Sequence, residues 1–460
     1  MKTASVSVKD IKYQDRYEPE YWIISERLHE LFEQHQWHVL DDDARFVRKG
    51  IFDLKAERYQ NHGIPFLRIS NLKYFELDKS GMVFITEEDN AVNKKTMLVE
   101  GDIAFSKIGT LGKILRVSSE YRCVNLSQNL IGVALKNEVD KNYIFAFLLS
   151  RCALMQINKN RKKQLQDKLN LNDVKDIRII DVAPEYKSKV STMVQEAVDI
   201  TSKINQLIEK ARAIFYSHIK VDFGNVKRKK FFSVKKSDFA NADLWIPEFS
   251  SPLYVGTNKV VRDCWKVVSI GDVTDLIKGD EVGSENYVSY LEKKETDVPF
   301  IRTSDIVNYE TDQYPDYFVP SEVYSELAQN IKVGDILFSK DGKIGQVGMI
   351  TNADRAIIAS GFCALRLNKE AEKLGLSSEY VFTALSIKEI GFYESKRRTV
   401  VASTIPHLRE DRIREIEIPI LDKSSIDEIT SLVREAFKLK AERKRLIADV
   451  RKTIDSYFEI

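Results

Sequence analysis

The chain repeats itself, and this repeat limits its fold more than any other feature of the sequence. The run Pro65–Ser70 (PFLRIS) recurs as Pro299–Ser304 (PFIRTS). The run Gly101–Lys107 (GDIAFSK) recurs as Gly334–Lys340 (GDILFSK), and two glycines follow each run with the same spacing. Because these runs come in the same order in both halves, the sequence predicts a tandem duplication of one structural unit.

A long amphipathic helix is predicted at the end of each copy. Apolar residues recur at heptad spacing in residues 184–222 and again in 423–460, which is typical of helices that pack through a continuous seam. The first seam is predicted to contain Val190, Met193, Ala197, Ile200, Ile204, Leu207, Ala211 and Ile214. The second is predicted to contain Ile429, Leu432, Ala436, Leu439, Arg443, Leu446 and Val450. Arg443 could set the register against a partner helix, but we expect its charged end to reach solvent.

Signals for helix starts and stops support both predictions. Pro184 opens the first helix, Gly224 stops it, and a capping box at Ser425 and Glu428 opens the second. Each helix could simply cover its own domain, but about four heptads exceeds the usual length of about three turns. A twofold axis between the copies would make the helices antiparallel. We therefore expect an antiparallel coiled coil with one head at each end.

The segment before each helix is predicted to be a β-rich head, so the fold class is α+β. Short runs of β-branched and aromatic residues alternate with glycine turns in both copies. Each head also has an apolar helix, at Tyr143–Met155 and Tyr380–Ile390, and a last strand, at Ile177–Val182 and Ile416–Ile420. The predicted domains are a first head (1–183), a central helix (184–222), a second head (223–422) and a C-terminal helix (423–460).

Composition narrows the class of protein. The 71 basic and 69 acidic residues leave a net charge of +2, so any binding of a polyanion must come from local clusters. The four cysteines are scattered and form no C-x-x-C pair, which fits the reducing cytoplasm better than a disulfide framework or a thiolate metal site. No apolar run is long enough to span a membrane. We expect a cytoplasmic protein.

Basic triplets occur at matching places in the two heads. A lone triplet is usually a solvated surface, but a matched pair is what two heads that face DNA would need, because Lys and Arg bind phosphates whatever the sequence. The first triplet is Arg161, Lys162 and Lys163, and the second is Lys396, Arg397 and Arg398.

Glycine turns and arginines supply further candidates for DNA binding. Lys107 precedes Gly109, and Lys340 precedes Gly342; glycines let backbone N–H groups approach a phosphate, although each turn could equally be a hairpin with a solvated lysine. Arg68 and Arg302 could reach guanine edges, but we favour pairing with a carboxylate inside each head.

Motifs for catalysis are absent from the sequence. No G-x-S-x-G, H-E-x-x-H or strand-associated G-x-G-x-x-G occurs. The close histidine pair His35 and His38 lacks a third ligand, and the carboxylates of Asp41–Asp43 would point in different directions, so we expect no metal site. The chain is predicted to be no enzyme and to hold no cofactor.

These motifs resemble the DNA-specificity (S) subunit of type I restriction-modification systems. The resemblance rests on Gly63–Ser70, on the paired G-D-I-x-F-S-K-x-G-x-x-G stretches, and on Thr404–Leu408 followed by Ile416–Pro419. It implies that each head recognises one half of a bipartite target in double-stranded DNA. It also implies that the helices space the heads and dock two methyltransferase (modification) subunits and restriction (translocase-nuclease) subunits, which would carry out the chemistry.

Some segments depart from the family pattern, and two other classes of function stay open. Residues 1 to about 50 and 231 to about 265 match weakly, and Leu165–Leu171 replaces the Ile-Pro-His-Leu run in the first head, so the heads are predicted to read different sequences. One alternative is the target-recognition part of a single-chain restriction-modification enzyme, but the sequence has no N-P-P-Y-like motif. The other is a coiled-coil adaptor without a role in DNA binding, which the paired basic clusters argue against.

Overall fold

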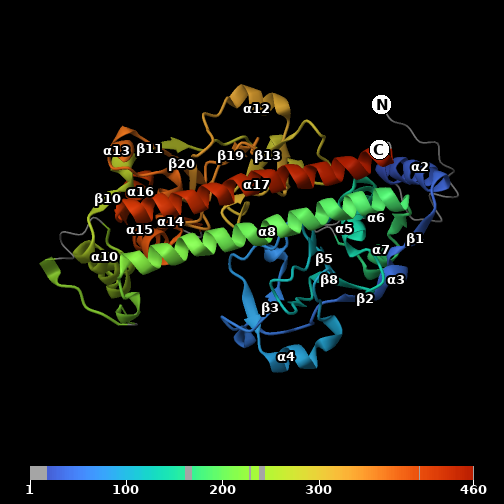
Figure 1. Ribbon diagram of the computed structural model, residues 1–460, viewed down its shortest axis with the longest axis horizontal. Helices are drawn as coiled ribbons and strands as arrows, with labels where there is room; N and C mark the ends of the chain where they lie inside the picture. Colours follow the sequence, from blue (N-terminus) through green and yellow to red (C-terminus); the bar gives the residue numbers. More distant parts are fainter. Residues whose placement is uncertain are drawn as a thin grey trace. The chain divides into compact units, whose positions relative to one another are not determined.

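A computed structural model describes residues 18–160, 168–226, 229, 231–237, 244–402 and 405–458. The chain forms two compact units. The first contains the residues up to Asp199 together with Tyr290–Glu292 and Arg443–Ile460, and the second contains Ile200–Ser289 and Lys293–Glu442. Each unit therefore holds most or all of one head and part of each long helix, α8 and α17 (Figure 1). The predicted domain ranges, which set the helices apart as segments of their own, stay a prediction.

The described residues of the first head form three sheets. A four-stranded antiparallel sheet has the order β2-β8-β5-β6, a three-stranded sheet has the order β4-β3-β7, and β1 pairs with β9. The elements are α2 (Pro19–Gln34), β1 (Trp37–Val39), α3 (Leu40–Asp43), β2 (Ala44–Lys49), β3 (Ile64–Leu67), β4 (Val83–Ile85), α4 (Glu87–Val92), β5 (Ile103–Ser106), β6 (Ile114–Arg116), β7 (Asn125–Leu126), β8 (Leu130–Leu135), α5 (Lys141–Leu149), α6 (Arg151–Asn160), α7 (Leu171–Lys175) and β9 (Arg178–Ile180).

The second head repeats this topology with added strands. Its main sheet has the order β11-β20-β17-β18, a second four-stranded sheet has the order β12-β16-β13-β19, and β10 pairs with β23. The elements are α10 (Pro252–Cys264), β10 (Val267–Ser269), α11 (Ile270–Val273), β11 (Thr274–Lys278), β12 (Val288–Ser289), β13 (Val298–Ile301), β14 (Ile306–Val307), β15 (Glu310–Thr311), β16 (Tyr317–Val319), α12 (Ser321–Leu327), β17 (Ile336–Ser339), β18 (Val347–Met349), β19 (Ile357–Ile358), β20 (Phe362–Leu367), α13 (Lys369–Lys373), α14 (Ser378–Ser386), a π-helix (Lys388–Phe392), α15 (Tyr393–Arg398), β21 (Val400–Ala402), β22 (Ile405–His407), α16 (Glu410–Arg414) and β23 (Glu417–Pro419).

The main sheets of the two heads have the same strand order, which supports the predicted duplication. The repeated runs form β3 and β13, and β5 and β17, at equivalent places in their sheets. The phenol of Tyr143 on α5 donates to the carbonyl of Ile180 at 2.6 Å, and Tyr380 on α14 donates to Pro419 at 2.8 Å. A tyrosine at the equivalent position of each head is therefore hydrogen-bonded to the last strand of that head. The predicted apolar helices and last strands are confirmed, although Ser150 divides the first helix into α5 and α6.

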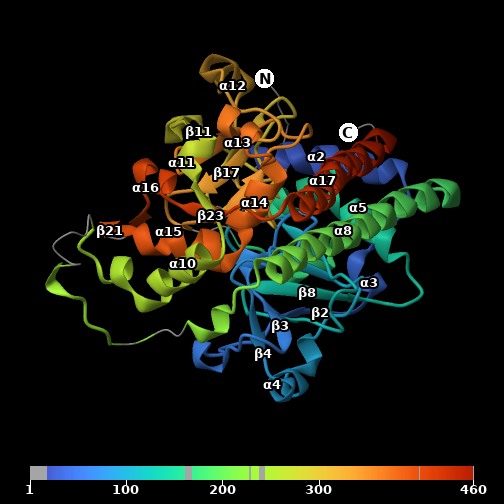
Figure 2. The same ribbon diagram turned by 60° about the vertical axis from the view of Figure 1, so that its left-hand side comes forward.

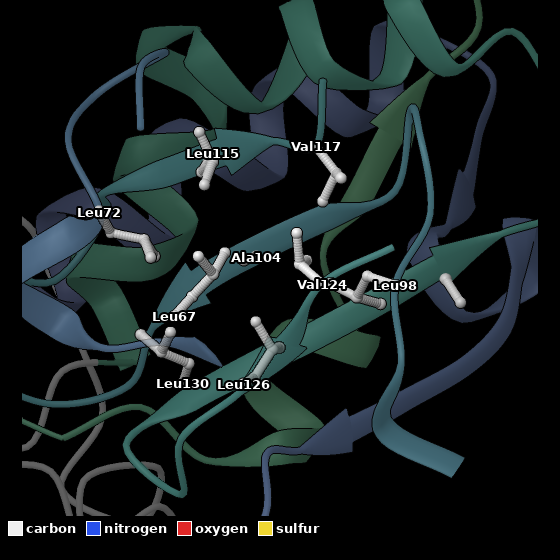
Figure 3. Packing of buried hydrophobic residues seen from close by; sticks show 10 residues of the cluster. Leu67, Leu72, Leu98, Ala104, Leu115, Val117, Val124, Leu126 and Leu130 are labelled. Carbon is white, nitrogen blue, oxygen red and sulfur yellow. The ribbon is translucent and has the colours of Figure 1, made fainter. Parts of the chain in front are cut away.

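Apolar side chains from the two larger sheets fill the core of the first head (Figure 3). Leu67 of β3, Ala104 of β5 and Leu126 of β7 are fully buried there. A strand that is buried on both faces loses the polar alternation of a half-exposed strand, which explains why β5 and β8 read as nearly continuous apolar runs. This packing holds the ends of β5 and β8, where the candidate site lies.

The two long helices are α8 (Pro184–Ile219) and α17 (Lys423–Tyr457). Both helices and the first residue of α8 were predicted correctly. The predicted end of α8 and the predicted N-cap of α17 were wrong. Helix α8 ends before Lys220, which has the left-handed φ of 49°, and not at Gly224. At the start of α17 the carboxylate of Asp422 accepts from the backbone N–H of Ser425 at 3.0 Å. Hydrogen bonding to Ser425 lowers the pKa of Asp422, so Asp422 caps the helix and Ser425 lies inside it.

The predicted seam is half right. Its first series is buried throughout, at Val190, Ala197, Ile204, Ala211, Ile429, Ala436, Arg443 and Val450. In the second series Ile200 and Leu439 are buried, but Met193, Leu207, Ile214, Leu432 and Leu446 are only half-buried. The buried positions lie one residue later, at Val194, Ile208, Phe215, Val433, Lys440 and Ile447. The heptad spacing cannot tell the predicted second series from the series one residue later. Both lie on the same helix face as the first series, because residues i+3 and i+4 are neighbours on a helix surface.

Arg443 does not extend to solvent as predicted. Its side chain is 3% exposed, and its Nη2 atom lies 3.1 Å from Oε2 of Glu76. A buried guanidinium needs a carboxylate partner because desolvation of an unpaired charge costs several kcal/mol. The partner comes from a hairpin more than 300 residues away in sequence, so the heptad pattern alone could not reveal it.

Contacts between α8 and α17 occur within each unit. In the first unit, the Tyr186 hydroxyl donates to the Thr453 carbonyl at 2.5 Å, and the rings of Tyr186 and Tyr457 lie 4.2 Å apart. In the second unit, Lys203 Nζ lies 3.9 Å from Glu435 Oε1. No helix among the described residues is long and apolar enough to cross a membrane.

Candidate nucleic-acid interface

Each head presents a loop after the repeated strand β5 or β17. We call these the lysine–glycine loops, Lys107–Gly112 and Lys340–Gly345. In the first loop the Ser106 hydroxyl donates to the Thr110 carbonyl at 2.7 Å, and in the second the hydroxyl of Ser339 donates to Lys343. The serine of the repeated F-S-K motif thus folds the loop onto the end of its own strand.

The two glycines of each loop have different structural roles. Gly109 and Gly342 have φ of 77° and 65°, and an added Cβ would meet nothing closer than 3.5 Å. Gly112 and Gly345 have φ of 82° and 76°, and an added Cβ would lie 3.0 Å from Leu154 or Ser395. All four need the left-handed conformation that glycine tolerates best. The second glycine also allows close packing against a helix, while the first lies in an open turn where a phosphate could approach its backbone.

A returning segment pairs with each loop. In the first head, the backbone N–H of Leu169 donates to the Lys107 carbonyl at 2.9 Å, and Ile108 bridges to Lys168. In the second head, Leu408 donates to Lys340 at 2.8 Å, and Asp341 bridges to His407. The segment that follows each basic triplet therefore lies beside the lysine–glycine loop of the same head.

Three lysines gather at this place in the first head. Burial lowers the pKa of Lys107, and the charges of Lys49 and Lys168 lower it further. Lys49 and Lys168 are exposed, and Lys107 is half-buried. Within the described part of the chain, no carboxylate forms an ion pair with any of the three. We call Lys49, Lys107 and Lys168 the lysine cluster; such a group of uncompensated cations attracts an anion with spaced charges, such as a nucleic-acid backbone.

Charges at the equivalent place in the second head are compensated. Lys340 Nζ lies 3.3 Å from Oδ2 of Asp341, and the other oxygen of Asp341 accepts from His407 Nδ1. Nearby, Thr303 Oγ1 would lie 3.5 Å from a Cβ added to Gly342. Polar groups that alternate in charge are better suited to hydrogen bonds with specific partners than to general attraction of phosphates.

The two candidate arginines are held in different ways. Arg302 Nε lies 3.1 Å from Asp305 and its Nη2 lies 2.9 Å from Asp316. Burial lowers the pKa of Arg302, but the two carboxylates outweigh this effect and raise it. The predicted internal pair is therefore confirmed for Arg302. Arg68 instead donates to the carbonyl of Gly81 at 2.6 Å, and its buried Nε has no hydrogen-bond partner among the residues that the structure describes.

The second basic triplet lies on α15, which packs beside α10 (Figure 2). Arg398 is buried and pairs with Glu394 and Glu415. Arg397 donates to the Phe249 carbonyl at 2.9 Å, and burial lowers its pKa. These two arginines make internal contacts instead of facing DNA as predicted, because a short helix packed on two sides buries adjacent positions. Lys396 is half-buried over the ring of Phe392.

The first triplet, Arg161, Lys162 and Lys163, lies outside the described residues. Sequence reasoning found Lys107 but missed Lys49 and Lys168. Lys49 ends β2 and pairs with Ile131 beside Phe105; its counterpart is Lys278 at the end of β11, which pairs with Cys363 beside Phe338. Each lysine precedes a glycine, Gly50 or Gly279, so extending the repeat to this dipeptide could have detected Lys49. Among the described residues, no group of three or more His, Cys, Asp and Glu side chains could hold a metal ion.

Several solved structures are similar to the chain at low sequence identity. The S subunit of a type I restriction-modification system from M. genitalium is 13% identical, with 91% of this chain and 95% of that chain covered and a TM-score of 0.37. The HsdS subunit from Thermoanaerobacter tengcongensis is 14% identical, with 92% and 95% covered and a TM-score of 0.28. The type IIG restriction endonuclease BpuSI is 12% identical, with 41% and 30% covered and a TM-score of 0.31.

Comparisons of sequence give one clear match. No curated protein matches the chain significantly. Residues 262–431 match the family model described as the type I restriction modification DNA specificity domain. This range runs from the end of α10 through the second head and into α17. The second half of the chain is thus similar to the type I restriction modification DNA specificity domain, in agreement with the resemblance that the repeated motifs indicate.

Proposed function

We propose that the chain is the specificity subunit of a type I restriction-modification complex and that each head recognises one half of a bipartite duplex target. One observation carries the proposal. The second head matches the DNA specificity domain, and the first head has the same strand order in its main sheet. The first head is then a second domain of the same kind, although the family model does not extend to it. The lysine–glycine loops are the surfaces that would face DNA.

The two heads would contact DNA differently. The lysine cluster of the first head suits contacts with phosphates, which position a protein without reading sequence. In the second head, Lys340, Asp341 and His407 compensate one another, so hydrogen bonds to base edges would contribute more there. Arg302 and Arg398, which pair internally, would hold the second head in shape; Arg161, Lys162, Lys163 and Lys396 stay candidates for phosphate contacts.

The long helices would form an antiparallel spacer. In support, Tyr186 near the start of α8 contacts Thr453 near the end of α17, while Lys203 further along α8 contacts Glu435 earlier in α17. Residue numbers fall along one helix as they rise along the other, which is the relation expected for antiparallel neighbours. At about 1.5 Å per residue each helix is roughly 50 Å long, more than the pitch of B-DNA, about 34 Å. The methyltransferase and restriction subunits would dock on these helices and supply catalysis.

Selection of DNA by the full chain tests this proposal. The chain would be co-expressed with the neighbouring genes, purified with what associates, and incubated with a pool of duplexes that carry two randomised blocks separated by gaps of graded length. We expect one bipartite motif with one gap length to be enriched, and a methyltransferase to co-purify. No enriched motif and no associated methyltransferase would favour the adaptor; DNA cleavage or methylation by the chain alone would favour a single-chain enzyme.

Shortening the helical spacer should change the number of base pairs between the two half-sites without changing the half-site sequences. Deletion of one heptad from both α8 and α17 removes about 10 Å, which corresponds to about three base pairs of duplex. We expect the selected gap to change while both half-site sequences stay the same. Deletion of a heptad from α17 alone is the control, since it would disturb the helix pair instead of shortening it evenly. An unchanged gap after the double deletion would refute the spacer.

A further inference from the structure

A hairpin follows the repeated β3 or β13 strand in both heads. Leu72 bridges to Leu77 in the first, and β14 pairs with β15 in the second. Phe75 and Tyr309 lie at the tips, with left-handed φ of 77° and 76°. That conformation costs a non-glycine residue about 1–2 kcal/mol. Two aromatic residues in the same costly conformation at equivalent places indicate that surrounding contacts hold both tips in one position.

Contacts inside each head hold the tips. The ring of Phe75 lies 5.5 Å from that of Phe145 on α5, and the ring of Tyr309 lies 5.4 Å from that of Phe382 on α14. The backbone N–H of Phe75 also donates to Ile114 at 3.1 Å on β6. In the second head the carbonyl of Tyr309 accepts from Met349 on β18. Equivalent elements, α5 and β6 in one head and α14 and β18 in the other, therefore hold each tip in place. The residue that follows the tip is a glutamate in both heads.

Each of these glutamates forms an ion pair with α17 inside its own unit. In the first unit, Glu76 Oε2 lies 3.1 Å from Arg443 Nη2, with side-chain exposures of 14% and 3%. In the second unit, Glu310 Oε1 lies 2.9 Å from Lys440 Nζ, and both side chains are 2% exposed. Lys440 also donates to the Asn308 carbonyl at 2.9 Å. Two buried cations on α17 thus meet two equivalent hairpins.

Duplication alone does not explain the cations. The offset between the two long helices aligns Lys440 with Thr201 and Arg443 with Ile204, so α8 has no cation at either place. A buried ion pair rarely stabilises a protein more than a well-packed apolar pair would, because desolvation offsets the attraction. It does discriminate strongly between arrangements, since any shift leaves a charge buried without its partner. These pairs are therefore suited to fixing position.

We infer that the Glu76–Arg443 and Glu310–Lys440 pairs fix each head at one register on α17 and thereby set where that head meets its half of the DNA target. The inference rests on the proposed function. Glu76 and Glu310 are positioning residues in this scheme, because they act through α17 and need not touch DNA. A head that could slide by one helix turn along α17 would move by about 5.4 Å, more than the rise of one base pair, about 3.4 Å.

Apolar replacement of a whole pair tests the inference. Glu310→Leu with Lys440→Met removes both charges, keeps the site filled, and should preserve folding. The full chain with its co-purified partners would select from the same pool of randomised duplexes. We expect the same half-site sequences, but enrichment of neighbouring gap lengths should rise by about tenfold. Glu76→Leu with Arg443→Met should have the same effect independently.

The matched control is the ion pair of exposed Arg434 with half-buried Glu379, which also joins α17 to the second head, at 2.8 Å. Replacing both by alanine should leave the single gap length unchanged, because an ion pair with a solvent-exposed cation contributes little. A folded apolar variant that still selects one gap would overturn the inference, and so would loss of folding in both apolar variants, which would make the pairs stabilising only. Failure of the unmodified chain to select any bipartite motif would instead contradict the proposed function.

Discussion

Asp102→Ala should destabilise the first head by about 4 kcal/mol. The carboxylate of Asp102 is fully buried and accepts hydrogen bonds from the backbone N–H groups of Val99 and Leu135, at 2.9 and 3.0 Å. Arg45 and Lys141 approach it at 3.2 and 3.5 Å. Alanine would leave the buried Leu135 donor and the half-buried Val99 donor without an acceptor, at up to about 1–3 kcal/mol each, and remove the partner of two cations. Chemical denaturation, with hydrogen exchange at the Val99 and Leu135 amides, measures the effect.

Two other aspartates provide the comparison. Asp42 is exposed in the same head, so Asp42→Ala should change the free energy of unfolding by no more than about 0.5 kcal/mol. In the second head Asp335 accepts from Lys332 at 2.7 Å and from Arg366 at 2.7 and 2.9 Å, so Asp335→Ala should resemble Asp102→Ala. If Asp102→Ala and Asp42→Ala had the same free energy of unfolding, the aspartate of the G-D motif would have no structural role.

The aspartate shows how far the repeat could be interpreted from sequence. Repetition of G-D-I-x-F-S-K predicted equivalent elements in both copies, and the sheets confirm this. It could not tell which of its residues support the fold and which face solvent. Asp102 and Ser106 turn inward to satisfy backbone groups, whereas Gly109 lies in an open turn. That division depends on strands β2 and β8, which are distant in sequence and approach β5 only in the folded head.

The long helices show a different limit. Heptad spacing predicted both helices and the first buried series, because that series recurs at every seventh residue. It placed the second series one residue too early, and Arg443, which was expected to reach solvent, is buried. Glu76 supplies the buried partner of Arg443, and Glu310 supplies that of Lys440. Extending the alignment of PFLRIS with PFIRTS by a few residues would have matched the two glutamates, but no local pattern indicates that their partners lie on α17.

Neutralising the lysine cluster should weaken DNA binding by roughly two to three orders of magnitude at about 0.1 M salt. The variant combines Lys49→Ala, Lys107→Ala and Lys168→Ala. Each lysine that contacts a phosphate releases about 0.9 of a counterion, so the slope of log K against log [salt] should become shallower by about 2.7. The loss should be the same for all DNA sequences, because phosphate contacts carry no sequence information. Titration of labelled duplex at several salt concentrations measures both quantities.

Stability separates this effect from damage to the fold. Burial lowers the pKa of Lys107, and the charges of Lys49 and Lys168 lower it further, so both of these lysines repel Lys107 in the free protein. Removing them should leave the free energy of unfolding unchanged or slightly higher, while binding to DNA falls. A variant that loses both stability and binding would contradict the assignment, since the lysines would then support the head and not the complex with DNA.

Two matched variants locate the effect on the first head. Lys189, Lys203 and Lys210 are exposed lysines of α8, and replacing all three by alanine removes the same charge from the chain; the salt slope should change by less than one. Lys340→Ala, at the equivalent place in the second head, removes a cation that Asp341 already compensates, so its effect should be smaller than that of Lys107→Ala. Equal losses from the α8 variant and the cluster variant would mean that net charge, and not the lysine–glycine loop, attracts the DNA.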